Sequence, residues 1–245
     1  MIAHLIPFGA SSPCDALKGQ RFSPPYDFSF ISHFKPTHTM KTTHRIIVCL
    51  IALICFCAQR AAADSPLTST NFHQAYADEP IVAQVEKGRT PSDETWAYLA
   101  APDNPVAVKM AIINKIGWAF EGKNSYQLFL SYLKRQGICK REKDLYQKRP
   151  GDLLLSAAYL KAMDNYFNVE EAARMARRAR QMHPDSYTVN IICALIEAQI
   201  AFDSDWGEVY RLTDAVRRNT TLKNDMNDEA KRIIFEYMDL YGSNA

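Results

Sequence analysis

The sequence predicts an all-α fold after residue 63, in which antiparallel helix pairs stack as a short α-α superhelix. Apolar residues recur at helical spacing through most of residues 105–241, and no long stretch alternates apolar and polar residues as a half-buried strand does. The breaks between the periodic segments are short, which makes consecutive helices antiparallel neighbours. A composition of 47% hydrophobic and 23% charged residues is typical of a globular chain with a core.

We expect the first 63 residues to lie outside this fold. Residues 40–45 are basic, residues 46–58 form an uncharged apolar run, and Ala61 and Ala63 precede Asp64. These are the three parts of a secretory signal peptide, so we predict cleavage between Ala63 and Asp64 and export to the periplasm or the cell exterior. The alternative is an uncleaved tether, although the apolar run is shorter than the roughly 20 residues of a membrane span.

Residues 1–39 have no helical period, and they are either a non-native extension upstream of a true start at Met40 or a disordered segment. Residues 1–63 hold six Lys or Arg and two acids, so the chain from Asp64 has 23 basic and 25 acidic side chains and a net charge of −2. Nucleic-acid binding requires a basic surface. This balance therefore predicts no nucleic-acid partner.

Residues 64–103 form a lead-in with short helices. Pro66, Pro80 and Pro91 interrupt it, because proline cannot continue a helix or a strand interior. We expect one short helix around 71–87 and a second beginning at Ser92, which is a favoured N-cap residue.

Residues 104–245 form the predicted helical-repeat domain. Gly137 follows the second of its helices, where glycine favours termination, and Asp152 and Asp205 are suited to cap later ones. A charged connector occupies residues 140–150. The predicted helices span residues 106–120, 126–136, 153–167, 169–182, 187–202 and 205–218. A last helix starts at Asn224 or Asp225 and reaches Tyr241.

The second helices of successive pairs, which begin near Tyr126, Val169 and Trp206, place core-facing residues at equivalent offsets. The run Val169-Glu170-Glu171-Ala172-Ala173, followed by Ala176, Ala179 and His183-Pro184-Asp185, resembles the second helix of a tetratricopeptide repeat. The resemblance covers residues 153–186 and is weaker at 111–136 and 187–221. The first helix departs from the family pattern, with Tyr159-Leu160 and Met163 where Leu-Gly and Tyr are usual. The resemblance implies a concave face that binds protein segments, without naming a partner.

The first helices of the pairs would line this concave face. Asn114 and Trp118 lie one turn apart on one of them, and Lys161 and Asp164 on another, so these four residues are the predicted groove contacts. The alternative is that Trp118 belongs to the core and that Lys161 and Asp164 form a surface ion pair of small energy.

Arginines cluster on the helix at 169–182. Arg174, Arg177 and Arg178 could form an anion-binding patch with Arg180. The more direct interpretation is a solvated face opposite the inward alanines, with basic side chains that complement the dipole at the helix C-terminus.

The chain after residue 63 keeps Cys139 and Cys193, and His73 and His183. The two cysteines could form one disulfide in an oxidising compartment, or Cys193 could be a buried thiol within an apolar helix. The histidines are too few for a His-rich metal centre, and no Walker, G-x-S-x-G or H-E-x-x-H motif is present. We predict no metal and no cofactor.

These observations predict an exported, non-catalytic scaffold that binds another protein or a peptide segment. One alternative is an envelope assembly factor tethered by residues 46–58, in which case the membrane is also a partner. The other is an α-α-fold enzyme that acts on carbohydrate, which would need carboxylates that converge in a cleft.

Overall fold

The computed structural model describes residues 65–119, 121–147 and 151–245, and in these ranges all the regular elements are helices, apart from one isolated bridge between Ser186 and Lys223. The prediction of an all-α fold is confirmed. The predictions for residues 1–63, including the Ala63–Asp64 cleavage site, lie outside the described residues. The elements, with η for 3-10 helices, are η1 (Phe72–Tyr76), α2 (Pro80–Ala83), α3 (Asp93–Ala100), α4 (Val106–Ile116), α5 (Ser125–Arg135), η2 (Glu142–Gln147), α6 (Asp152–Asp164), α7 (Glu170–Met182), α8 (Tyr187–Ala201), α9 (Trp206–Arg218), α10 (Asp228–Met238) and η3 (Asp239–Asn244).

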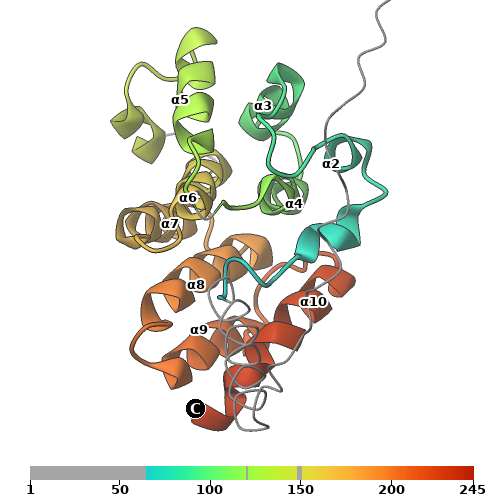
Figure 1. Ribbon diagram of the computed structural model, residues 1–245, viewed down its shortest axis with the longest axis vertical. Coiled ribbons are helices and arrows are strands. Elements are labelled where there is room, and N and C mark those ends of the chain that lie inside the picture. The colour runs from blue at the N-terminus through green and yellow to red at the C-terminus, as the bar shows by residue number, and fades with distance from the viewer. Residues whose placement is uncertain (1–64, 120, 148–150) are drawn as a thin grey trace, which may run out of the picture. The chain divides into compact units, whose positions relative to one another are not determined.

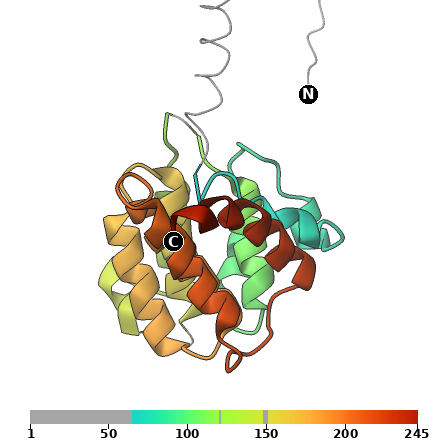
Figure 2. The same ribbon diagram turned by 90° about the horizontal axis from the view of Figure 1, so that it is seen from below.

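Antiparallel pairs stack side by side, as predicted. Helix α6 packs on α7, α7 on α8, and α8 on α9, and α4 extends the row by contacting α6 and α8 (Figures 1 and 2). Ala172, Ala173, Ala176 and Ala179 are all buried on the inward face of α7, where short side chains let neighbouring helices approach closely. The first pair is an exception, because α5 packs on α3 and α6 instead of forming a close hairpin with α4.

Several helix ends follow from single residues. The side chains of Ser92 and Asp205 accept hydrogen bonds from the backbone N–H groups of Thr95 and Glu208, which confirms both as N-caps. Helix α4 ends at Ile116, earlier than residue 120, because Gly117 adopts a left-handed φ of 71°.

Two acids expected at helix starts have other partners. Asp225 accepts hydrogen bonds from the backbone N–H of Thr188, at 2.8 Å, and from its hydroxyl, at 2.9 Å. The last helix therefore begins later than expected, at Asp228 with Asn227 as its N-cap. Asp152 does not cap α6 either. Its carboxylate is turned into the core and pairs with Lys109 of α4.

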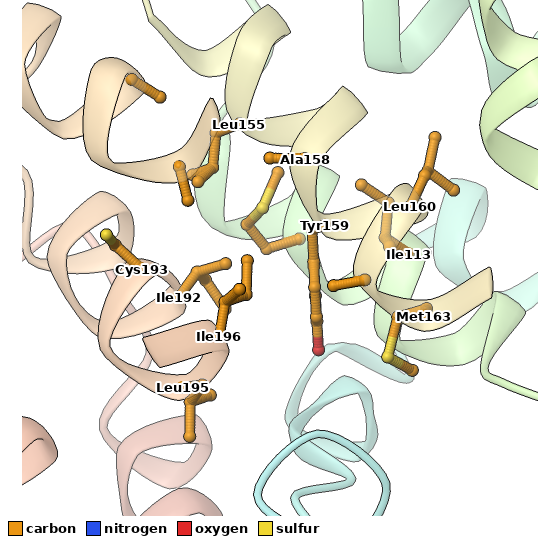
Figure 3. Close-up of a cluster of buried hydrophobic side chains, with 14 of the residues drawn as sticks. Ile113, Leu155, Ala158, Tyr159, Leu160, Met163, Ile192, Cys193, Leu195 and Ile196 are labelled. Carbon is orange, nitrogen blue, oxygen red and sulfur yellow. The ribbon is translucent and has the colours of Figure 1, made fainter. Parts of the chain in front are cut away.

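Helix α6 lies at the centre of the packing. All of its residues are buried except Lys161, which is half-buried, and α6 contacts α3, α4, α5, α7, α8 and η2. A helix that is apolar around its whole circumference is expected to be enclosed on all sides. Figure 3 shows Tyr159 of α6 between Ile113 of α4 and Ile192 and Ile196 of α8.

The ion pair between Lys109 and Asp152 lies inside this core. The side chain of Lys109 is completely inaccessible to solvent and that of Asp152 is 5% exposed. The Lys109 ammonium also donates a hydrogen bond to the carbonyl of Ala101, just after α3. One buried cation therefore connects α4, α6 and the end of α3.

The lead-in packs against the helical stack as part of its core. Leu67 and Phe72 are buried, and η1 contacts both α4 and α10. The backbone N–H of Asn227 donates to the hydroxyl of Tyr76 at 2.9 Å, which joins the lead-in to the last helix. The single helix expected around 71–87 is instead split into η1 and α2, and α2 begins with Pro80.

The first prediction concerns the Lys109–Asp152 pair. Lys109→Met or Asp152→Asn removes one charge and leaves the other buried without its counter-ion, so either single change should lower the free energy of unfolding by about 3–5 kcal/mol. The double variant Lys109→Met/Asp152→Leu should recover most of this loss, because neither charge remains. Urea denaturation gives the free energies.

The matched control is Arg89→Met, which breaks the exposed ion pair with Glu86 and should cost less than about 1 kcal/mol. Equal losses for the buried and exposed pairs would contradict this account of the core.

Candidate functional site

Asn114, one of the predicted groove contacts, is at the centre of a buried polar network. Its side-chain oxygen accepts hydrogen bonds from the backbone N–H of His73, at 3.0 Å, and from the His73 ring Nδ1, at 2.8 Å. Its amide nitrogen donates to the carbonyl of Thr70, at 2.9 Å, and to the hydroxyl of Tyr159, at 3.0 Å. Every hydrogen-bonding group of the Asn114 side chain therefore has a partner within the fold.

This network shows what covers the inner side of α4 and α6. Thr70 and His73 come from the lead-in, while Asn114 and Tyr159 come from α4 and α6. The predicted concave face is thus occupied at this point by the chain's own residues 65–76. Asn114 is only 4% exposed and is not accessible to a partner in this conformation.

Trp118 is half-buried. Its ring meets the ring of Tyr166 edge to face, with centroids 5.1 Å apart. It packs at the margin of the core, on the segment that follows α4.

Lys161 and Asp164 do not pair with each other, contrary to the surface-pair alternative. Asp164 accepts hydrogen bonds from the backbone N–H groups of Ser125, at 3.1 Å, and Tyr126, at 2.8 Å, so it caps the start of α5. Burial raises the pKa of Asp164 against the opposing effect of these donors. Lys161 pairs with Glu171 of α7 at 2.6 Å, and its ammonium lies 4.6 Å from the centre of the Tyr126 ring.

The arginines of α7 mostly bind within the fold. Arg177 and Arg180 both pair with Glu197 of α8, at 2.6 and 3.2 Å. Arg178 donates to the carbonyl of Tyr146, at 3.3 Å, and so holds η2 against α7. Arg174 is exposed and has no ion-pair partner in the described part of the chain. The contacts therefore agree with the structural interpretation of the cluster, and anion binding stays a prediction.

The possible disulfide between Cys139 and Cys193 is not formed, and Cys193 is a buried thiol, as its alternative interpretation has it. Both cysteines are buried, Cys139 after α5 and Cys193 within α8. Burial raises the pKa of the Cys193 thiol to about 12, and the nearby Glu197 carboxylate acts in the same direction. Cys193 is therefore a small core residue with an unreactive thiol.

An open cleft of about 580 Å³ lies between α2 and α3, in the lead-in. The residues that line it are mostly apolar, and two of them are glutamates. The lining residues are Glu79, Pro80, Ile81, Gln84, Glu94, Ala97, Tyr98, Ala101 and Asn104. Asn104 donates to the carbonyl of Tyr98 at 2.9 Å, which holds the segment after α3 against that helix.

This cleft is not among the predictions from the sequence, because the pattern of residues 64–103 indicates only a lead-in with short helices. An available signal was a set of acids around the two short helices that have no basic residue at helical pairing distance: Asp78, Glu79, Glu94 and Asp103.

A second cleft of about 480 Å³ lies between α7, α8 and α9. Arg180, Glu197, Glu208 and Arg211 line it, but these charges already pair with one another or with neighbours: Arg180 with Glu197, and Arg211 with Glu208 and Asp205. A charged ligand would have to displace these pairs. The cleft between α2 and α3 is therefore the better candidate site.

Within the described ranges, no group of three or more His, Cys, Asp or Glu side chains is placed to hold a metal ion. Among the same residues, no helix combines the length and apolar character needed to cross a membrane.

In comparisons with known proteins, the chain matches no family model, and no curated protein or solved structure is significantly similar to it.

The second prediction concerns pH. Burial lowers the pKa of His73 below its ordinary value of 6.5, and Lys115 and Lys87 lower it further, against the opposing hydrogen bond to Asn114. The unfolded chain then binds the His73 proton more readily than the folded chain does. The contribution of neutral His73 to stability is complete above pH 6.5 and is lost as the pH falls toward the lowered folded pKa.

Between pH 7.5 and pH 5 the wild-type melting temperature should therefore fall more than that of His73→Gln, which has no titrating ring. His183→Gln, changed at the end of α7, serves as a comparison for the loss of a histidine elsewhere in the fold. Parallel curves for the wild type and His73→Gln would refute the assignment.

The third prediction concerns the thiols. Iodoacetamide at pH 8 should leave Cys139 and Cys193 unmodified in the folded protein, because both are buried and the Cys193 thiolate is not populated. In urea without a reducing agent both should be alkylated. Peptide mass spectrometry locates the label. A Cys139–Cys193 peptide that reacts only after reduction would show that the disulfide forms after all.

Proposed function

We propose that residues 64–245 form an exported, non-catalytic, tetratricopeptide-like scaffold that binds a segment of another protein. The stacked pairs α6–α7 and α8–α9 provide a rigid frame, and the inward alanines of α7 support the likeness to the repeat family. The family resemblance in the sequence suggests peptide binding at the inner face. We place the binding site elsewhere, because the lead-in occupies that face at Asn114.

The observation that carries this proposal is the open, mostly apolar cleft between α2 and α3. Solvent-exposed apolar surface in a concave site is costly to leave uncovered, and partners bind to such sites by burying it. Ala97 is exposed on one wall of the cleft, and Ile81 and Tyr98 are half-buried there.

Export is supported by the sequence of residues 40–63. Cleavage after Ala63 would leave only Asp64 ahead of a segment in which Ser65 and Leu67 are already buried. An uncleaved tether would hold the domain within a few residues of the membrane. Intact mass of the protein from its native cells separates the two forms, since only the cleaved form begins at Asp64.

An enzyme that acts on carbohydrate is the second candidate, because Glu79 and Glu94 both line the cleft. A glycosidase needs one carboxyl group that remains protonated, and a desolvated environment usually provides this. Both glutamates are exposed to solvent, so the cleft lacks this environment. Binding is therefore the function that its geometry supports better.

The fourth prediction tests binding directly. A photocrosslinking amino acid in place of Ala97 should capture a discrete partner in the native cells, because Ala97 faces the cleft. The same group in place of exposed Gln127 on α5 should not capture that partner. Replacing Tyr98 by Ala in the Ala97-labelled protein should reduce the yield several-fold.

Equal capture from both positions, or none from Ala97, would overturn the scaffold proposal. Release of sugar from cell-wall polysaccharide by the wild type, abolished by Glu79→Gln or Glu94→Gln, would establish the enzyme instead.

A further inference from the structure

The cleft between α2 and α3 combines an apolar surface with unneutralised negative charge. Pro80, Ile81 and Ala97 contribute apolar surface, and Tyr98 adds an aromatic ring. No lysine or arginine is among the lining residues of this cleft. Glu79, at the start of α2, and Glu94, in the first turn of α3, both line the cleft.

The acids around this cleft differ from most others in the described chain. Asp78, Glu79, Glu94 and Asp103 form no ion pair and no side-chain hydrogen bond with any described residue. Elsewhere the exposed acids commonly have basic neighbours, such as Glu229 with Arg232 at 2.6 Å and Asp205 with Arg211 at 3.1 Å. Glu79 and Tyr98 line the same cleft. Burial raises the pKa of Tyr98, and the negative charge of Glu79 acts in the same direction.

We propose that the α2–α3 cleft binds a basic, amphipathic peptide segment of a partner protein, and this proposal rests on the scaffold function proposed above. Apolar side chains of the segment lie on Ile81, Ala97 and Tyr98, and its Lys or Arg side chains face Glu79 and Glu94. The charge complementarity favours a cationic partner over an acidic or neutral one. A cleft of about 580 Å³ has room for a few side chains of such a segment.

The test uses the purified full chain and two fluorescein-labelled probes of 18 residues. One probe is a helical Leu/Lys peptide, and the other has the same sequence with Glu in place of every Lys. Fluorescence anisotropy at physiological salt gives the affinities. The Leu/Lys probe should bind, the Leu/Glu probe should bind at least tenfold more weakly, and rising salt should weaken Leu/Lys binding because exposed charges are screened.

Variants locate the binding. Glu79→Gln/Glu94→Gln should weaken Leu/Lys binding about five- to tenfold through the loss of two exposed charge contacts. Ala97→Gln, which places a polar side chain on the wall, should weaken it as well. The matched control is Glu121→Gln/Glu170→Gln, which removes the same charge from two exposed, unpaired glutamates outside the cleft, one of them also in the first turn of a helix. The control should bind like the wild type.

Several results would overturn this proposal. Equal binding of both probes would refute charge recognition, and equal weakening by the control pair would refute the location. A dimer in sedimentation velocity that Ala97→Gln dissociates would make a second copy the occupant. If neither probe binds while Ala97 crosslinks a discrete partner in cells, the peptide chemistry is wrong but the scaffold function stands. If the probe binds as predicted and Ala97 captures no partner, the scaffold function fails.

Discussion

The burial of α6 on all sides is the constraint on which the rest of this structure depends. A helix enclosed by six other elements cannot leave a polar group without a partner, because each such group would cost about 1–3 kcal/mol or more. The polar side chains of α6 therefore determine which residues its neighbours must supply. Asp152 forms an ion pair with Lys109 of α4. The Tyr159 hydroxyl accepts a hydrogen bond from the Asn114 amide, and Asp164 caps the start of α5. The short alanines of α7 then let the next helix approach closely enough to complete the enclosure.

Because of the same constraint, the candidate site does not lie on the inner face, where a tetratricopeptide-like protein is expected to bind its partner. Asn114 both satisfies Tyr159 and holds the lead-in through Thr70 and His73, so residues 65–76 cover the inner surface beside it. Lys161 and Asp164 are likewise used to hold α7 and α5 in place. What stays available is the mostly apolar cleft between α2 and α3, where no described basic residue pairs with Glu79 or Glu94.

Local sequence signals predicted much of the fold and little of the candidate site. Ser92, Gly137 and Asp205 mark helix ends through effects that act within one turn, and the structure confirms each of them. Asp152 and Asp225 have the same local appearance as N-caps, but Lys109 and Thr188, which lie 43 and 37 residues away, are their actual partners. An acid of this kind can either cap a helix or bind a distant partner. Which contact it makes depends on the groups that the fold brings close to it, and the sequence does not give those distances.

By itself, the sequence determined that the chain after residue 63 is helical and that the helices pair, because a period of 3.6 residues and short connections are properties of neighbouring residues. Only the tertiary structure decided that Cys139 and Cys193 remain thiols, that the lead-in fills the inner face, and that Glu79 and Glu94 line one cleft. Each of these depends on which segments meet in space. Which segments meet is decided by the packing that buries the apolar surfaces of all the helices together.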